Sequence, residues 1–262
     1  MTDLEKTNLL FFASEAEQGE DNTKENVGGL LSAELSRKLA VEVVGTYALA
    51  LVAAASGSPI YVGFALAALV CAFGHISGGH FNPAVSLAVY LRGKSDLKTF
   101  FTYALAQIAG AFIGAAQHNY ALTDQGLTFA ANGGFPELGT FTTASGQPIA
   151  SGKASAGSAF LAELTATMIF TTVILNVATT RAQAKNSFFG IAIGFVLTAL
   201  ASSIGNVSGG CLNPALGIAL PALAEKTDDI WIYIVAPLLG GALGAGFFRF
   251  TADPDEFKEK GE

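Results

Sequence analysis

The chain carries the tripeptide Asn-Pro-Ala twice, and this repetition constrains its fold more than any other feature. The copies are Asn82-Pro83-Ala84 and Asn213-Pro214-Ala215, each just after a Gly-Gly pair and flanked by strongly apolar sequence. A proline just inside a helix start costs nothing, because its missing N–H would have no helical partner there. The asparagine before it is well placed to cap that helix. We therefore expect two short helices that begin at an asparagine, one in either half of the chain.

The composition places these helices in a membrane. Of the 262 residues, 51% are hydrophobic and 13% are charged, whereas a soluble domain carries about 25% charge. The net charge of −7 excludes a basic nucleic-acid-binding face. The two cysteines, Cys71 and Cys211, lie in apolar sequence and predict no disulfide framework. The first 30 residues lack a signal-peptide pattern, so we expect the first span to act as the targeting signal.

Six apolar segments are long enough to cross a bilayer, and two more are too short. The six spans are expected at about 37–56, 60–76, 98–118, 157–179, 187–205 and 230–250, and the short Asn-Pro-Ala segments at about 82–91 and 213–222. Paired interrupted segments at matching places are typical of an inverted-repeat pore or transporter. The predicted fold is an all-α membrane protein with six transmembrane helices and two re-entrant half-helices, in repeats at about 36–118 and 157–250.

The basic residues predict the orientation of this bundle. With six spans, most of them fall on the side of both termini, and only Lys153 and Lys226 fall on the other. By the positive-inside rule, both termini are cytoplasmic. The pore domain, residues 36–250, then lies between acidic tails at 1–35 and 251–262, and segment 119–156 forms an external loop. The plasma membrane is the default location, with an organelle membrane as the alternative.

Further matching residues in the two halves carry a family resemblance. Glu42 and Glu163 lie in the first and fourth spans, and Gln107 precedes Gly110-Ala111 in the third. With the Asn-Pro-Ala boxes and the run from His75 to His80, these residues make the chain resemble the aquaporins, or major intrinsic proteins, over roughly residues 36–250. The resemblance implies half-helices that meet at the bilayer centre, and a homotetramer in membrane lipid with one pore per subunit.

The two boxes predict which particles such a pore binds and which it excludes. Each half-helix N-terminus carries roughly half a positive charge. Asn82 and Asn213 can cap their helices through the side-chain oxygen and still point an amide N–H into the lumen. Water or a small uncharged solute would accept from those amides, which breaks a proton-conducting chain, while the dipoles repel cations. The alternative is that both asparagines only cap helices.

Four polar residues are expected to support the pore loops. A carboxyl group within the membrane usually has a function, and the resemblance implies that Glu42 and Glu163 hydrogen-bond the loop backbone, with proton transfer as the alternative. For His75 it implies a loop-orienting or lumen-lining role, with a plain buried hydrogen bond as the alternative. Gln107 is placed in the same supporting set.

The outer constriction departs from the family pattern. Water-selective members place an arginine directly after the second box and a histidine on the fifth span, and the matching residues here are Leu216 and Ala201. The two other matching positions are Val62 and Gly210. Such a filter offers only backbone hydrogen-bonding groups, so we expect it to be wider and more apolar than a water-only filter. The aspartate usual in glycerol-conducting members is also absent, since Gly217 takes its place.

Three functions are compatible with these features. The first is a passive channel for water or small uncharged solutes such as glycerol, urea, hydrogen peroxide, ammonia or gas. The second is a poorly conducting scaffold in a membrane complex, because an apolar constriction can dewet and block flow. The third is a secondary transporter, a class that also uses inverted repeats.

No nucleophile, base and stabiliser are grouped in the sequence, so no enzyme and no catalytic residues are expected. The histidines have no acidic cluster near them, and we expect neither a metal site nor a cofactor.

Overall fold

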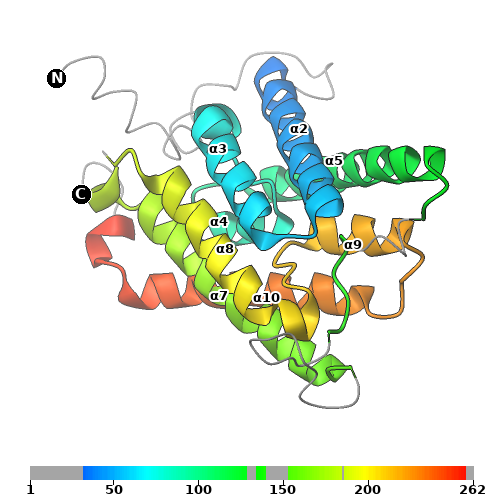
Figure 1. Cartoon of the computed structure of the whole chain (residues 1–262). Coiled ribbons are helices and arrows are strands. Elements are labelled where there is room, and N and C mark those ends of the chain that lie inside the picture. The colour runs from blue at the N-terminus through cyan, green and yellow to red at the C-terminus, as the bar shows by residue number, and fades with distance from the viewer. Residues whose placement is uncertain (1–31, 129–133, 140–152, 185, 258–262) are drawn as a thin grey trace.

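The computed structural model describes residues 32–128, 134–139, 153–184 and 186–257, and the secondary structure within these ranges is helical (Figure 1). Six long apolar helices have the length of membrane spans: α2 (Ala33–Ser56), α3 (Pro59–Ser77), α5 (Leu97–Asp124), α7 (Ala156–Thr179), α8 (Phe189–Ser208) and α10 (Ile230–Thr251). Two shorter helices begin at the prolines of the boxes, α4 (Pro83–Leu91) and α9 (Pro214–Leu223). The predicted architecture of six spans and two half-helices is confirmed.

The connecting segments differ from the sequence prediction in two places. Helix α5 continues to Asp124, so the first part of the predicted loop 119–156 is helical. Residues 129–133 and 140–152 of that loop lie outside the described residues, as do residues 1–31 of the predicted tail 1–35. The predicted tail 251–262 contains a 3₁₀ turn, η3 (Pro254–Phe257), and its last residues, 258–262, lie outside the description. A second 3₁₀ turn, η2 (Arg181–Gln183), follows α7.

Within each repeat, two long helices approach each other closely through glycine. A Cβ placed on Gly110 of α5 would lie 2.3 Å from the carbonyl oxygen of Val43 in α2. A Cβ on Gly240 of α10 would lie 2.5 Å from the carbonyl oxygen of Leu164 in α7. Small residues are the usual means by which helix backbones approach within a membrane. The same device therefore joins the first and last span of both repeats.

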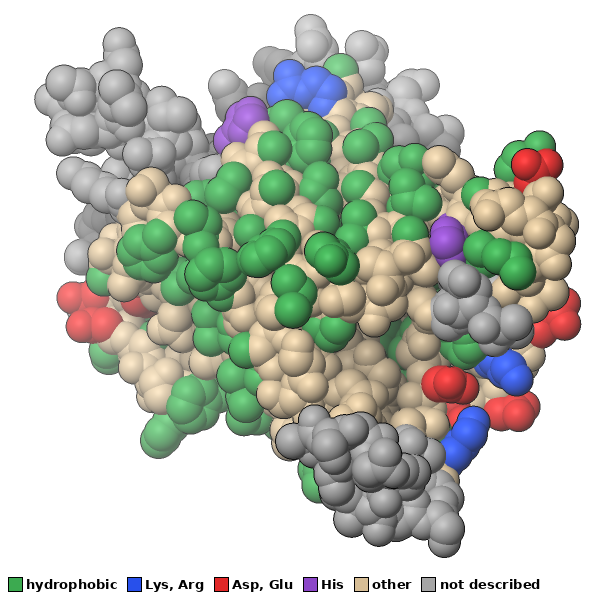
Figure 2. All heavy atoms as spheres, in the orientation of Figure 1, with side chains coloured by type: hydrophobic (Ala, Val, Ile, Leu, Met, Phe, Trp, Pro, Cys, Tyr) green, Lys and Arg blue, Asp and Glu red, His purple; other side chains and the backbone are tan. Residues whose placement is uncertain are grey.

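Large apolar side chains cover the outside of the bundle. More than half of the residue surface is exposed at Tyr61, Phe64, Leu105, Leu161 and Phe195. Figure 2 shows hydrophobic side chains spread across one face of the molecule. Soluble proteins rarely expose continuous apolar surface of this extent, whereas a lipid-facing surface requires it.

Candidate functional site

Each half-helix is capped by the asparagine of its box. The side-chain oxygen of Asn82 accepts from the backbone N–H of Ala84 at 2.8 Å, and that of Asn213 accepts from Ala215 at 3.0 Å. The proline occupies the first helical turn in both cases. Both short helices therefore start for the reason that the sequence suggested, namely a capping side chain followed by a residue that has no N–H to satisfy.

The two half-helices meet end to end through a reciprocal pair of hydrogen bonds. The amide nitrogen of Asn82 donates to the carbonyl oxygen of Leu212, and that of Asn213 donates to the carbonyl oxygen of Phe81, both at 2.9 Å. A carboxamide nitrogen carries two hydrogens. Among the described contacts each nitrogen makes this one bond, so each asparagine keeps a second N–H with which to donate to a ligand.

The residue before each asparagine has an unusual backbone conformation. Phe81 has a φ of 49° and Leu212 a φ of 53°, in the left-handed region that non-glycine residues adopt at a cost. Both residues donate their N–H to a buried carboxylate, Phe81 to Glu42 at 2.7 Å and Leu212 to Glu163 at 2.8 Å. The strained turn is thus held by a charge-assisted hydrogen bond.

The two glutamates make closely matching sets of contacts. Besides Phe81, Glu42 accepts from the Ser77 hydroxyl at 2.7 Å, the N–H of His80 at 3.0 Å and the Gln107 amide at 2.8 Å. Both of its oxygens are therefore occupied by loop or supporting groups.

In the second repeat, Glu163 accepts from the Ser208 hydroxyl and the N–H of Cys211, both at 2.8 Å, in addition to the N–H of Leu212. Pro237 stands where the first repeat has Gln107 and can donate nothing. Both glutamates are fully buried, and in each repeat the carboxylate serves as an acceptor for the turn that precedes the asparagine.

The structure separates His75 from this network. His75 lies near the end of α3 with its side chain exposed, and among the described residues none of the hydrogen bonds that hold the loop involves it. The loop-orienting or lumen-lining role of His75 therefore stays a prediction, and the hydrogen bonds described for the loop give it no support. His80 is the buried histidine of the loop: its Nδ1 lies 3.1 Å from the Ser86 hydroxyl, and its ring makes a T-shaped contact with that of Tyr103.

Two tyrosines complete the site and were missed by the sequence analysis. Tyr103 donates its hydroxyl to the carbonyl oxygen of Ser77, and Tyr233 donates to that of Ser208, both at 2.8 Å. They occupy equivalent places, four positions before Gln107 and before Pro237. A residue-by-residue alignment of the two repeats contains this signal.

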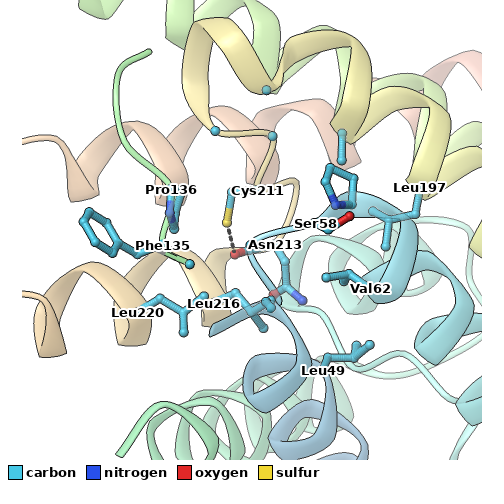
Figure 3. A pocket seen from close by; sticks show the side chains of 18 of the residues that line it. Leu49, Ser58, Val62, Phe135, Pro136, Leu197, Cys211, Asn213, Leu216 and Leu220 are labelled. Carbon is cyan, nitrogen blue, oxygen red and sulfur yellow. Dashed lines mark hydrogen bonds between the residues drawn. The ribbon is translucent and has the colours of Figure 1, made fainter. Parts of the chain in front are cut away.

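A cavity of about 700 Å³ lies against the two asparagines. Its lining includes all four predicted filter residues, Val62, Ala201, Gly210 and Leu216. Figure 3 shows Val62 and Leu216 near the side chain of Asn213, with Leu49, Leu197 and Leu220 extending the apolar wall. A side chain cannot replace Gly210 easily, because its φ is 67° and a Cβ would lie 2.4 Å from the carbonyl oxygen of Ala201.

Carboxylate and ammonium groups reach this cavity only at its mouth, as far as the described lining shows. Glu137 and Lys153 form an ion pair at 3.7 Å, and both side chains are more than half exposed. The segment 134–139, which carries Glu137, is fastened to the end of α8 by a bond from the N–H of Gly139 to the carbonyl oxygen of Val207 at 3.1 Å. The rest of the described lining is mostly apolar or backbone; its polar side chains are uncharged at neutral pH or carry only an imidazole or a thiol, namely Ser58, His80, Asn82, Ser202, Asn206, Cys211 and Asn213. Within the described residues, no group of three or more histidine, cysteine or acidic side chains is placed to hold a metal ion.

Comparisons with known proteins agree on one family. The family model described as "Major intrinsic protein" matches residues 30–248. The chain is 35% identical over 232 residues to "Glycerol uptake facilitator protein-like 6" of Lactiplantibacillus plantarum, covering 84% of this chain and 100% of that protein. It is 31% identical to "Nodulin-26" of Glycine max, over 89% of this chain and 86% of the relative.

A solved structure shares the fold. It is the aquaglyceroporin from Plasmodium falciparum, with a TM-score of 0.66 and 23% identity, covering 85% of this chain and 98% of that one. Family membership fits six apolar spans, and the members of this family are channels rather than enzymes. The chain belongs to the major intrinsic protein family, the aquaporins and their relatives, and is accordingly an integral, multi-pass membrane channel for water or small solutes.

Proposed function

We propose that this channel has a relaxed filter that passes small uncharged solutes together with water and excludes ions and protons. The observation that carries the proposal is the set of residues Val62, Ala201, Gly210 and Leu216 around one cavity. No side chain in this set can donate a hydrogen bond or carries a charge. Names such as glycerol facilitator and aquaporin among the relatives support both kinds of cargo.

Ion exclusion would come from the half-helix ends rather than from the filter. The N-termini of α4 and α9 meet at the asparagines and direct the positive ends of two helix dipoles to one place. A cation there meets positive potential and loses its hydration shell in a cavity whose wall is mostly apolar. A water molecule accepts from the free N–H groups of Asn82 and Asn213 and turns its own hydrogens away from them, which interrupts a proton wire.

Solute passage would follow from the apolar wall. A polyol or urea brings its own donors, which backbone carbonyls can accept, and its carbon skeleton loses little on leaving water. An arginine at the place of Leu216 would occupy part of the cavity and would compete with the solute for the backbone carbonyls. Its absence therefore supports a broader cargo than water alone.

The experiment is stopped-flow light scattering on proteoliposomes that contain the purified full-length protein. We expect faster shrinkage than in empty vesicles under an impermeant osmolyte, and faster re-swelling with glycerol, urea or another of the named solutes. A pH-sensitive dye inside the vesicles should report no added proton flux. Vesicles that respond like empty ones to water and to every solute would favour the non-conducting scaffold, and saturable, gradient-driven uptake would favour a secondary transporter.

The assembly and orientation are part of the same proposal. We infer a homotetramer in membrane lipid, both termini on the cytoplasmic side, a pore domain over residues 36–250 and the plasma membrane as its location. The distribution of basic residues supports the orientation. Thiol labelling of a single cysteine at Lys94 or at Lys226, in a chain whose Cys71 and Cys211 are replaced by alanine, tests it in right-side-out vesicles, because only the second should react from outside.

A further inference from the structure

Arg92, the residue directly after half-helix α4, is buried in an aromatic cage. Only 5% of its surface is exposed, although arginine is almost never buried unless it is paired. Its guanidinium carbon lies 4.9 Å from the ring centre of Phe248 in α10 and 4.8 Å from that of Phe257 in η3. Both distances are within the range of cation–π attraction.

A carboxylate from the same turn completes the cage. Nη2 of Arg92 lies 3.1 Å from Oε2 of Glu256 and 3.3 Å from the Glu256 carbonyl oxygen. The other carboxylate oxygen of Glu256 accepts from the backbone N–H of Arg181 at 2.7 Å. The turn after α10 is thus tied both to the end of α4 and to η2, the turn that follows α7.

The inverted repeat does not require this arrangement. The position that matches Arg92 after the second box is Leu223, at the end of α9. The chain there continues through Glu225, which is exposed and has a φ of 59°. Half-helix α4 is therefore followed by a charged residue in a tertiary contact, whereas α9 ends at an apolar residue and a surface turn. The contact at Arg92 is an addition specific to the first repeat.

We propose that the turn Pro254–Phe257 is a clasp that positions half-helix α4 through Arg92, and that the segment after α10 thereby controls how firmly the first Asn-Pro-Ala helix is held. Within this clasp, Glu256 and Phe257 make the contacts with Arg92.

Half-helix α4 is short enough for a displacement at one end to be transmitted to the other. Half-helix α4 has nine residues and a length of about 13 Å. Its N-terminus carries Asn82 and is held by the Glu42 network, so a shift at its C-terminus tilts the helix about the pore-lining end.

Loss of the carboxylate would release the clasp for an electrostatic reason. Arg181 and Arg249 approach the same turn, the first through its N–H to Glu256 and the second with its guanidinium carbon 5.2 Å from the Phe257 ring centre. Without the Glu256 carboxylate, the buried guanidinium of Arg92 would lose its ion-pair partner. An uncompensated buried charge is strongly unfavourable, so Arg92 would move toward water and take the end of α4 with it.

The test compares Glu256→Gln and Phe257→Leu with the control Asp255→Asn, which removes a carboxylate from the same turn that is not among the Arg92 contacts described above. Hydrogen exchange is measured at the backbone amides of Arg92 and Lys94, which bond to Ala88 and Val89. We expect exchange to be about tenfold faster or more in both clasp variants. It should be unchanged in Asp255→Asn and close to that of the parent in Glu256→Asp, which keeps the charge.

Water permeability per folded channel is the second readout, because a merely structural contact would change the yield of folded protein but not the flow through each pore. We expect a several-fold fall in water permeability and a steeper temperature dependence of it in Glu256→Gln. Little further loss is expected when Arg92→Met is added, since both changes break the same contact.

Unchanged exchange in both clasp variants would overturn the proposal. So would faster exchange with unaltered permeability. The exchange measurement does not depend on conduction, so a parent protein that conducts nothing would defeat the proposed function and leave the holding of α4 testable by itself.

Discussion

Leu216 is the residue on which the cargo depends most. It occupies the third position of α9, lines the cavity and packs against the small residues of an apolar cluster. Its side chain can neither donate nor accept, so it leaves cavity volume and backbone carbonyls to the solute. The selectivity of the channel should therefore respond to this single position.

Leu216→Arg is expected to reduce glycerol or urea permeability by about tenfold or more while water permeability stays within a few-fold of the parent, because a guanidinium narrows the filter and occupies carbonyl acceptors. Stopped-flow measurements on one set of proteoliposomes give both values. The control is Leu216→Met, which keeps an apolar side chain of similar volume and should change neither. Equal loss of water and solute in the arginine variant would contradict the assignment of the filter.

Residue types and spacing predict the charged and capping groups of the site but not the rotation of every helix. Glu42, Glu163 and the two asparagines stand out because a polar group in an apolar repeat needs a partner. His75 looks equally distinctive, yet it lies on an exposed side of α3, and His80, five positions later, is the one that enters the loop. Which side a residue faces depends on tertiary packing, and proximity to a motif along the chain does not contain that information.

At the scale of the helices, the start of α5 shows how a surface side chain fixes an element. Asp96 accepts from the N–H of Thr99 at 2.6 Å and caps the helix. Burial opposes ionisation of Asp96, but the hydrogen bonds from Thr99 and the nearby lysines outweigh it and hold its pKa below the ordinary value. A depressed pKa means that ionised Asp96 stabilises the fold above the unfolded-state pKa, and that this stabilisation is lost as the pH falls through the folded-state value.

Asp96→Ala should cost about 1 kcal/mol of stability at neutral pH. This corresponds to a thermal midpoint lower by about 2–4 °C, measured by unfolding of the purified protein in detergent. The difference between parent and variant should shrink as the pH falls below about 4. Asp96→Asn serves as the control, since it keeps a capping oxygen and should lie close to the parent at neutral pH. A difference that grows at low pH would show that the cap acts in another way.

The spans were predictable from hydropathy, while the connections were only partly so. Helix α5 continues past the predicted end of its span because residues 119–124 contain no helix breaker, and the helix gives way just before Gly126, whose φ is 72°. That glycine was visible in the sequence as a stop signal. The turn η3 was not predictable, since it depends on contacts with Arg92 and Arg181, which lie far away along the chain.

At the scale of the whole molecule, the two repeats are alike in the pore and unlike at the far ends of their half-helices. The cap, the strained turn, the glutamate and the tyrosine recur in both halves with nearly the same distances. Duplication explains why so much of the site could be read from sequence, because each feature occurs twice. Arg92 has no such copy, and no comparison of the halves could have revealed its cage.

The reciprocal bonds between the boxes also have a consequence for biogenesis. Asn82 donates to Leu212 and Asn213 donates to Phe81, so neither half can satisfy its own pore turn. The first half is synthesised before the second. Until the second half is in the membrane, the hydrogen bonds between the two boxes are missing from the end of the first half-helix. Two separately expressed halves, divided between residues 145 and 146, should therefore conduct when they are co-expressed and reconstituted together, whereas either half by itself should not. In such a channel, the pore is completed only when the two halves come together, as the last step of assembly.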